Sequence, residues 1–408
     1  MESIKEFLKR YNQEHLLMFY DSLTEQEKDA LVQDISSIDF KFMEDIKSDQ
    51  EVVQTSDEIL PVRAVRKVHY TQNEIESLEA KGRKIIEQGQ YAIVTMAGGQ
   101  GTRLGHDGPK GTFKLNLNTG EKYIFEIFVD YLKRAYDKYN IHLSWYIMTS
   151  KDNNKQTIEF FETHNYFGYP KDKIKFFIQG ELPITDLEGN LLLESKSKLL
   201  KAADGNGGVF NALSGVLPDM KAQGVKWVLI TGIDNILVNL ADELYIGLVE
   251  SENKLNGVKS VAKSEPEEKV GVFCKRNGKP GVVEYSEMND EMRYAKYKNG
   301  ELAFAEANIV NHLLNINVLE KIQNESLPIH RAIKKMRYID KDGTVQNPSQ
   351  PCLIKYEAFI FDYFDKVNDV TILRVERDKE FAPVKNKEGA DSPETAAKLY
   401  NELYHKEV

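Results

Sequence analysis

Residues 91–115, YAIVTMAGGQGTRLGHDGPKGTFKL, place a glycine-rich loop directly after a short apolar run. The run YAIV is typical of a buried β-strand. Because glycine has no Cβ atom, a ligand can lie directly against the backbone, whose N–H groups can point at anionic oxygens. Arg103 adds a fork of donors and Lys110 a compact positive charge. The loop therefore predicts a site for a phosphate-bearing ligand, the alternative being a tight turn whose cations are merely solvated.

Two common phosphate-binding motifs do not fit this loop. A P-loop, G-x-x-x-x-G-K-[ST], needs lysine directly after glycine, but Pro109 separates Gly108 from Lys110. The dinucleotide fingerprint G-x-G-x-x-G starts at Gly99 and fails at Leu104. These two failures disfavour a P-loop ATPase and a nicotinamide-dependent dehydrogenase.

The composition narrows the class of protein further. The chain has 408 residues, 41% of them hydrophobic, and a formal net charge of −10. An acidic globular chain of this kind indicates neither a nucleic-acid partner nor an anionic membrane. The two cysteines, Cys274 and Cys352, lack metal-type spacing. Since the charged N-terminus has no signal-peptide core and no apolar run could span a bilayer, we expect a cytoplasmic protein.

Short apolar runs alternate with longer helical stretches in the middle of the chain. Strands are expected at 91–97, 143–150, 173–179 and 226–233. Helices are expected between them at 123–139, 157–164 and 210–224. This alternation is typical of an α/β fold with a doubly wound, mostly parallel, Rossmann-like sheet. Residues 257–306 are richer in turns and suggest an insertion or an antiparallel extension of that sheet.

The two ends of the chain look different from this middle part. Residues 1–38 predict two helices, the second with a capping box of Thr24 and Glu27, and a polar linker follows at 44–61. A further helix at 71–90 has Thr71 and Glu74 as its capping box, and a last helix begins after Ser392. We therefore divide the chain into an N-terminal helical region with linker (1–60), a catalytic domain (61–385) and a short helical tail (386–408).

The glycine loop also carries a family resemblance. The order G-G-x-G-T-R-L-G…P-K matches the loop of nucleotidyltransferases that join a sugar 1-phosphate to a nucleoside triphosphate, and AGGQGTRLG…PKG resembles the eukaryotic-type UDP-N-acetylhexosamine pyrophosphorylases, or UTP–sugar-1-phosphate uridylyltransferases. Further blocks follow in the family's order at 203–213, 232–238, 265–274, 282–287, 308–312, 354–362 and 378–386. The resemblance implies a nucleotidyltransferase domain behind a small helical region. It also implies a C-terminal domain that usually follows, and this sequence stops at Val408.

The resemblance implies which residues form the site. Those expected to act on the phosphates in catalysis are Arg103, Lys110 and Lys385, and Asp234 is expected to hold Mg²⁺. The expected substrate-binding residues are Ala97, Gly98, Gly99, Gln179, Gly205, Asn206, Glu284, Asn308, Lys355, Phe359 and Phe361. Among these, the family pattern puts Gln179 near the uracil and Gly205 near the nucleotide. It puts Asn206, Glu284 and Asn308 near the sugar, and Lys355 near the phosphates.

From the residues alone, each of these positions also has a structural interpretation. Asn206 could cap the helix at Phe210, and Asp234 could cap the turn after its strand. Glu284 could be an exposed strand residue, and Gln179 an edge residue. Phe359 and Phe361 could be core residues, which is the better interpretation for at least one of them, and lone lysines are usually solvated.

The resemblance implies that UTP and a sugar 1-phosphate react to give a UDP-sugar and pyrophosphate, with N-acetylglucosamine 1-phosphate as the favoured sugar. A UDP-glucose or broad-specificity enzyme is the alternative, and a non-catalytic UDP-sugar sensor is a second one. Arg103, Lys110 and Asp234 argue against a sensor, which needs no pyrophosphate clamp. The sequence departs from the family pattern N-A-G-N-I at Glu306 and Ala307, beside the expected sugar pocket. We therefore expect broader or altered use of sugars.

Overall fold

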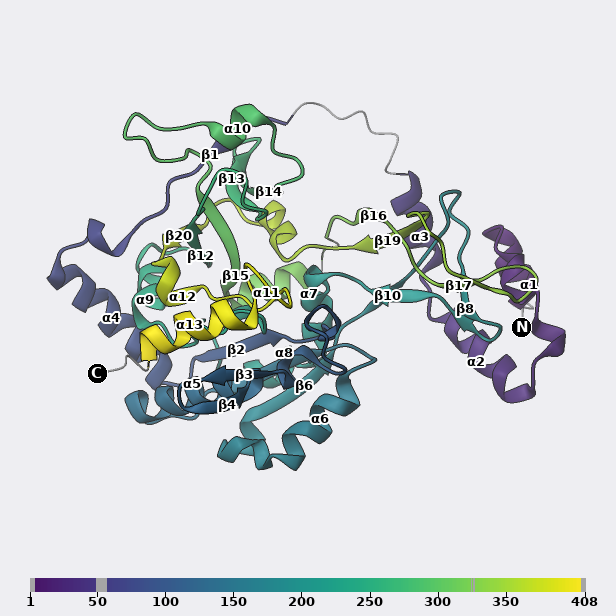
Figure 1. Ribbon diagram of the computed structural model, residues 1–408, viewed down its shortest axis with the longest axis horizontal. Coiled ribbons are helices and arrows are strands. Elements are labelled where there is room, and N and C mark those ends of the chain that lie inside the picture. The colour runs from purple at the N-terminus through teal and green to yellow at the C-terminus, as the bar shows by residue number, and fades with distance from the viewer. Residues whose placement is uncertain (1–3, 49–56, 324, 326, 405–408) are drawn as a thin grey trace. The chain divides into compact units, whose positions relative to one another are not determined.

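The computed structural model describes residues 4–48, 57–323, 325 and 327–404 (Figure 1). The chain divides into two compact units, and each is described by itself. The smaller unit contains residues 1–56, 180–208 and 327–360, and the larger unit contains residues 57–179, 209–326 and 361–408. The sequence-based division at residues 60 and 385 follows the chain in order, so it does not capture this grouping of separate segments.

Four parallel strands form the part of the larger unit's sheet that carries the glycine loop. They are β6 (Ile174–Ile178), β5 (Ser144–Thr149), β2 (Tyr91–Met96) and β11 (Trp227–Gly232), side by side in that order. All four were expected from the sequence. Gly232 pairs with Met96, so β2 and β11 end at the same edge. The residues that follow these two strands therefore start from neighbouring positions.

The sheet continues beyond β11 with a different pattern, and it has ten strands within the described residues. The long strand β15 (Glu306–Asn315) is antiparallel to β11, and β12 (Asn256–Ala262) is antiparallel to β15. The remaining strands are β20 (Thr371–Arg374) beside β12, and β13 (Val272–Arg276), β14 (Lys279–Val283) and β1 (Ile59–Pro61) beyond β15. The expected antiparallel extension at 257–306 is confirmed. A separate hairpin joins β3 (Lys114–Leu117) to β4 (Gly120–Tyr123).

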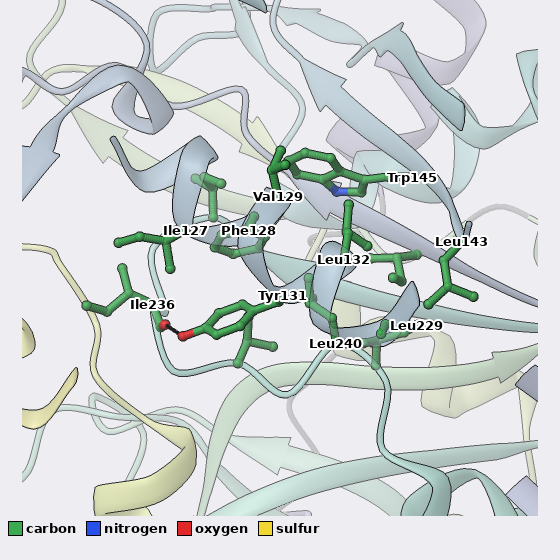
Figure 2. Packing of buried hydrophobic residues seen from close by; sticks show 14 of the residues in the cluster. Ile127, Phe128, Val129, Tyr131, Leu132, Leu143, Trp145, Leu229, Ile236 and Leu240 are labelled. Atoms are coloured by element: carbon green, nitrogen blue, oxygen red, sulfur yellow. Dashed lines mark hydrogen bonds between the residues drawn. The ribbon is translucent and has the colours of Figure 1, made fainter. Parts of the chain in front are cut away.

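Helices cover both faces of the sheet. Since successive residues of a strand point to opposite sides, one strand can contact helices on both faces. In β5, Trp145 packs against Phe128 of α5, with the rings stacked at 6.0 Å, and Tyr146 donates a hydrogen bond to Asp219 of α8 at 2.6 Å. Figure 2 shows the first of these layers, where Tyr131 also donates to the Ile236 carbonyl. The helices of the larger unit are α4 (Gln72–Glu87), α5 (Ile124–Tyr139), α6 (Asn154–Thr163), α7 (Val209–Ala212), α8 (Leu217–Ala222), α9 (Glu243–Ser251), α10 (Asp290–Tyr294), α11 (Ile316–Gln323), α12 (Arg377–Glu380) and α13 (Pro393–Tyr404).

The structure corrects two expectations, one about a helix and one about the linker. The helix expected over 210–224 is broken into α7, a 3-10 turn at Leu213–Gly215 and α8, since Pro218 has no N–H to continue a helix. The linker expected at 44–61 is partly regular structure: its first residues belong to α3 and Ile59–Pro61 form β1, which pairs with β13. Residues 49–56 of that expected linker lie outside the described residues.

The smaller unit joins an N-terminal helical part to short strands from later in the chain. Its helices are α1 (Ile4–Arg10), α2 (Glu25–Ser36) and α3 (Phe40–Ser48), one more than the sequence predicted. Its strands are β7 (Glu181–Pro183), β8 (Leu193–Ser195), β9 (Lys198–Leu199), β10 (Lys201–Ala203), β16 (His330–Lys334), β17 (Tyr338–Ile339), β18 (Val345–Gln346) and β19 (Leu353–Glu357). Leu8, Leu31 and Ile35 share one buried cluster with Leu193 and Leu199, which explains why distant segments group together.

The predicted capping boxes are both present. Thr24 caps α2 with Glu27, and Thr71 caps α4 with Glu74. Ser392 accepts a hydrogen bond from the Thr395 N–H at the start of α13, as expected. Across the described residues, every helix is too short or too polar to cross a bilayer.

Candidate active site

The glycine loop begins where β2 ends, and a buried amide fixes its first residue. The N–H of Ala97 donates to the Met148 carbonyl at 2.7 Å, and Asn153 donates to the Ala97 carbonyl at 3.1 Å. A Cβ atom on Gly98 would lie 2.8 Å from Oε1 of Gln179. Only glycine therefore allows Gln179, one residue past β6, to come so close to the loop. The structure brings these predicted nucleotide-binding residues together.

The loop then folds back on itself, so that Lys110 lies beside the first residues of the loop. Gly101 donates to the Gly108 carbonyl at 2.9 Å, and the N–H of Lys110 donates to the Gly99 carbonyl at 3.1 Å. The next residue, Gly111, lies against the ring of Phe125, where a Cβ would be only 2.2 Å away. The glycines of the sequence motif therefore serve two purposes, close backbone approach and tight packing on α5. The side chain of Lys110 starts beside the backbone of Gly99.

Three charged side chains predicted for the site act electrostatically on a fourth, Lys110. Burial lowers the pKa of Lys110 below its ordinary value, the cations Lys385 and Arg103 lower it further, and Asp234 opposes them. Lys110 and Asp234 are half-buried, and Arg103 is exposed. The group has three cations and one carboxylate, so it holds an excess of positive charge. An excess of this kind suits a multiply charged anion.

Asp234 follows β11, and Lys385 follows a segment that pairs with it. The N–H of Val384 donates to the Asp234 carbonyl at 2.8 Å. Lys385 lies 3.8 Å from Asp391 and 5.5 Å from the ring centre of Phe381, and its side chain is 40% exposed. The two residues therefore sit on neighbouring backbone segments at the carboxyl end of the parallel strands. This is the edge where open α/β sheets bind ligands.

The donor set near Asp234 fits one kind of metal better than others. Within the described residues there is no group of three or more His, Cys, Asp or Glu side chains that could hold an ion. A lone carboxylate does not make a zinc or calcium site. Mg²⁺, in contrast, commonly binds one or two protein carboxylates together with substrate phosphates. Asp234 near the cations Lys110, Arg103 and Lys385 fits that pattern.

Two predicted sugar-binding residues meet around Gly271 in the larger unit. The N–H of Asn308 donates to the Gly271 carbonyl at 2.9 Å, and a Cβ on Gly271 would lie 2.7 Å from Oε1 of Glu284. Glu284 is not an alternating strand residue, since β14 ends at Val283. The Oδ1 atom of Asn308 accepts from the N–H of Val310, whose φ of +54° marks an irregularity in β15.

Four predicted residues belong to the smaller unit. Gly205 has a φ of +88°, and a Cβ there would lie 2.3 Å from the Ala358 carbonyl oxygen, so this position requires glycine. Oδ1 of Asn206 accepts from the Ile360 N–H at 2.8 Å, which links the Gly205 turn to the segment around Phe359. Lys355 pairs with Glu357 at 2.7 Å.

The fourth of these residues, Phe359, is half-buried and packs on His330 with ring centres 4.7 Å apart. Phe361, which the structure assigns to the larger unit, is also half-buried. Ile360, Tyr363 and Phe364 are the core residues of the same turn, at 0–2% exposure. Neither predicted phenylalanine is among the fully buried residues of this turn. Their part in a sugar pocket stays a prediction.

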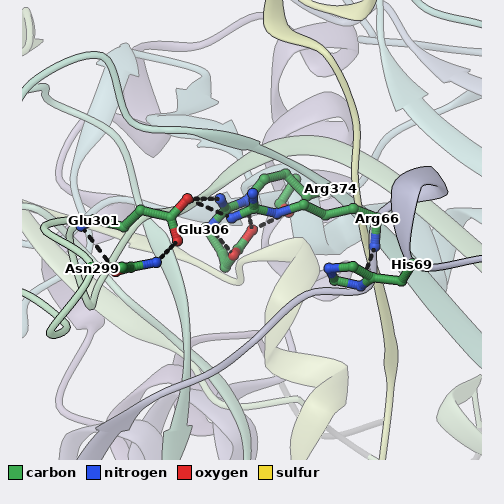
Figure 3. A network of polar contacts seen from close by, with 7 residues as sticks. Arg66, His69, Asn299, Glu301, Glu306 and Arg374 are labelled. Atoms are coloured by element: carbon green, nitrogen blue, oxygen red, sulfur yellow. Dashed lines mark hydrogen bonds and ion pairs between the residues drawn. The ribbon is translucent and has the colours of Figure 1, made fainter.

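The departure from the family pattern at Glu306 and Ala307 lies inside the larger unit. Glu306 is 2% exposed and forms an ion pair with Arg374, which Figure 3 shows at the centre of a polar network. Ser260 donates to the same carboxylate at 2.6 Å. Ala307 is fully buried in a cluster with Val261 and Phe381. Any influence on the sugar would have to act through the strand, since neither side chain is exposed.

Sequence reasoning missed two buried amides that hold the site's backbone. Asn153 fixes the loop at Ala97, and Asn235 bonds to Glu380 and Ala382 in the segment that carries Lys385. Both follow closely after the end of a parallel strand. A buried asparagine next to a predicted ligand-binding loop is a usable signal, because its amide must find partners.

Comparison with known proteins agrees with this arrangement. The family model described as UTP--glucose-1-phosphate uridylyltransferase matches residues 37–393. The UDP-N-acetylglucosamine diphosphorylase 2 of Arabidopsis thaliana is 34% identical over 430 residues, covering 99% of this chain and 84% of the relative. The UDP-N-acetylglucosamine pyrophosphorylase of Saccharomyces cerevisiae is 39% identical over 336 residues, or 79% of this chain and 70% of the relative.

The fold is also found in solved structures. The uridine diphosphate N-acetylglucosamine pyrophosphorylase of Trypanosoma brucei, solved with an inhibitor, superimposes with a TM-score of 0.81 at 30% identity, covering 96% of this chain and 82% of that one. The resemblance seen in the sequence motifs is confirmed. With its glycine loop, its cation-rich sheet edge and a family match over most of its length, this chain belongs to the UTP–glucose-1-phosphate uridylyltransferase family.

Proposed function

We propose that this chain converts UTP and N-acetylglucosamine 1-phosphate to UDP-N-acetylglucosamine and pyrophosphate. The observation that supports this most is the charge cluster of Lys110, Arg103, Lys385 and Asp234 at the carboxyl end of β2 and β11. The two substrates bring many negative charges together, and the cluster's excess of positive charge can stabilise them. The relatives at 34–39% identity are named for the same product.

The reaction needs alignment and charge neutralisation more than a base. A phosphate oxygen of the sugar 1-phosphate attacks the α-phosphorus of UTP in line and forms a new P–O bond. The bond from that phosphorus to the oxygen bridging the β-phosphate breaks, and pyrophosphate leaves with the electron pair. The attacking oxygen is already ionised, so no proton has to be removed from it. Catalysis by positioning and electrostatics is typical of phosphoryl-type transfer.

The charged residues have separate parts in this proposal. Lys110 and Arg103 hold the departing pyrophosphate, and Lys385 reaches the phosphates from the segment opposite Asp234. Asp234 would hold Mg²⁺, and such an ion, when bound, neutralises charge on the phosphate oxygens. The backbone of Gly98 and Gly99 approaches the nucleotide, with Gln179 beside it. Glu284 and Asn308 would bind sugar hydroxyls.

We also propose a cytoplasmic location. Both cysteines are free thiols in the structure, as expected in a reducing compartment. Fractionation of cells that express the tagged full-length protein tests this, and recovery in a secreted or membrane fraction would contradict it.

One assay tests the function. The purified protein is given UTP, MgCl₂ and a panel of sugar 1-phosphates, and pyrophosphate release is measured. We expect the highest kcat/KM with N-acetylglucosamine 1-phosphate. A higher value with glucose 1-phosphate would make the chain a UDP-glucose enzyme. Binding of UDP-sugars with no pyrophosphate release from any pair would favour the sensor.

A further inference from the structure

Asn235 is a buried amide that bridges two segments of the candidate site. It directly follows Asp234 and is 3% exposed. Its Nδ2 donates to the Glu380 carbonyl at 2.8 Å, and its Oδ1 accepts from the N–H of Ala382 at 2.9 Å. The same oxygen accepts from the N–H of Leu237 at 3.2 Å. One side chain thus ties the turn after β11 to the segment that leads to Lys385.

The backbone on both sides of Asn235 pairs with the same segment. Val384 donates to the Asp234 carbonyl at 2.8 Å, and Ile236 donates to the Ala382 carbonyl at 3.2 Å. These bonds form an isolated antiparallel bridge in which Asn235 is opposite Pro383. Residues 234–236 therefore run beside residues 382–384, and Lys385 is the next residue.

A proline is compatible with the pairing opposite Asn235. The backbone bonds on either side make Asn235 and Pro383 a non-hydrogen-bonded antiparallel pair, in which an N–H at position 383 would point away from Asn235, so Pro383 removes no bond from the bridge. Two hydrogen bonds of the asparagine amide, to Glu380 and Ala382, add to this pairing. Without them, two backbone hydrogen bonds would be left to hold the register of residues 382–384.

The segment is also anchored at its far end. The carboxylate of Glu380 lies 2.5 Å from Nζ of Lys259, which is fully buried and also pairs with Asp242 at 2.6 Å. The anchored stretch between Glu380 and Val384 is therefore short. Asn235 bonds to this stretch at Glu380 and at Ala382. Its amide therefore helps to fix the direction of the backbone that leads from Glu380 to Lys385.

We propose that Asn235 is a positioning residue for this reaction: its amide fixes the segment of Lys385 against the turn of Asp234, so that both charged groups face the same phosphates. This rests on the proposed parts of Lys385 and Asp234 in the reaction. Asn235 touches no substrate in this account. It acts through Lys385, so the effect of replacing Asn235 should depend on whether Lys385 is present.

This dependence predicts a non-additive double-mutant cycle in the full chain. Asn235→Ala is expected to lower kcat about tenfold to a hundredfold, because a displacement of about 1 Å has that effect on aligned groups. In a Lys385→Ala background the same change is expected to alter kcat by less than about twofold, the ordinary limit of additivity. KM for UTP is expected to change less than kcat, since the lost alignment matters most in the transition state.

A matched control is available in the same loop. Asn239 is exposed and accepts from the N–H of Ala241 at 3.3 Å, and its side chain forms no hydrogen bond with the described residues 380–385. Asn239→Ala is expected to leave kcat within about twofold of the wild type. If Asn235→Ala does not fold, Asn235→Ser replaces it in the cycle, because its hydroxyl can keep one of the hydrogen bonds.

A binding measurement provides a readout apart from turnover. Pyrophosphate is titrated into the protein in a calorimeter with EDTA present, so that no metal contributes. Asn235→Ala is expected to weaken pyrophosphate binding severalfold in the wild-type background and not at all in the Lys385→Ala background.

Three outcomes separate the possible failures. Additive losses in kcat and in pyrophosphate affinity would overturn the positioning inference, because Asn235 would then act independently of Lys385. Unchanged activity and unchanged pyrophosphate affinity in Lys385→Ala would overturn the part given to Lys385, and the inference with it. No pyrophosphate release by the wild type would overturn the proposed function itself. The calorimetric cycle would then still test whether Asn235 acts on pyrophosphate binding through Lys385.

Discussion

Two lysines of the larger unit, Lys259 and Lys110, are placed among charges in opposite ways. Lys259 is fully buried between Asp242 and Glu380, at 2.6 and 2.5 Å. Burial alone would lower its pKa, but the two carboxylates raise the pKa of Lys259 above its ordinary value. Lys110 is half-buried with two cations and one carboxylate near it, and burial together with those cations lowers its pKa. The surroundings stabilise the first charge and destabilise the second.

The difference indicates what each cluster is for. The Lys259 cluster is complete without any ligand, so its loss should affect folding. Among its own four residues, the Lys110 cluster has more cations than carboxylates, and it lies at the carboxyl end of the parallel strands, where open α/β sheets bind ligands. Charges that are unfavourable in the free protein become favourable when an anion arrives. Substitutions in the Lys259 cluster should therefore change stability, and substitutions in the Lys110 cluster should change turnover.

The largest expected effect is on stability, from Lys259→Met. Removing Lys259 leaves the buried carboxylates of Asp242 and Glu380 without their cation, which costs about 3–5 kcal/mol in the free energy of unfolding. Urea unfolding measures it. The control is Lys254→Met, since Lys254 also pairs with two carboxylates, Glu252 at 3.2 Å and Asp369 at 3.1 Å, but is 27% exposed. We expect about 1 kcal/mol or less there. Equal losses in the two variants would contradict the comparison.

The next largest effect is on turnover, from Asp234→Asn. The variant keeps the shape of the side chain and removes the carboxylate that acts on Lys110, so it should lower turnover at millimolar Mg²⁺ more than about a hundredfold. Pyrophosphate release over a range of MgCl₂ concentrations measures it. Activity like that of the wild type at low Mg²⁺ would mean that another group holds the ion.

The pH dependence of kcat/KM should show a smaller effect of the same cluster. Because the pKa of Lys110 is lowered, its charge is lost at a pH below that of an ordinary lysine, and kcat/KM for UTP should fall on the alkaline side accordingly. Removing a neighbouring cation raises a lysine pKa, so Arg103→Gln should move this alkaline limb to higher pH. A limb that stays in place would show that Lys110 does not titrate there.

The smallest effect is expected from Ala307→Gly. The sequence departs from the family pattern at Ala307, beside the expected sugar pocket, but the side chain is fully buried beside Val261 and Phe381. The ratio of kcat/KM for N-acetylglucosamine 1-phosphate to that for glucose 1-phosphate should change by less than about threefold. A methylene that lines a pocket changes such ratios about 10–200-fold. A change in that range would place Ala307 at the sugar after all.

Some of this could be predicted from the sequence, and some could not. The four parallel strands are short apolar runs bounded by turn residues, so β2, β5, β6 and β11 were expected, as was a ligand at their carboxyl ends. The place of β15 between β11 and β13 could not be predicted, because it depends on pairing between distant segments. The same holds for the smaller unit, whose core joins Leu8 to Leu193.

The different surroundings of Lys259 and Lys110 could not be predicted from the sequence either. Lys259 lies in an ordinary strand pattern, GVKSVA, and nothing local marks it as buried. Its partners Asp242 and Glu380 are far away along the chain. Lys110, in contrast, was identified by the motif around it. A motif records chemistry that is local in sequence, whereas a buried charge cluster arises only when the chain has folded.

The most direct test of the central claim is to measure stability and catalysis together for Lys110→Met. The pKa of Lys110 is lower in the folded protein than in the unfolded chain. At pH 7 the Lys110 charge therefore contributes unfavourably to the free energy of unfolding. This unfavourable contribution lessens only as the pH rises past the folded pKa. Without ligand, Lys110→Met should be at least as stable to urea as the wild type. Its kcat/KM should be lower by more than about tenfold, with the affinity for UDP-N-acetylglucosamine retained. A variant that loses stability as Lys259→Met does and keeps kcat/KM within about twofold would contradict the account.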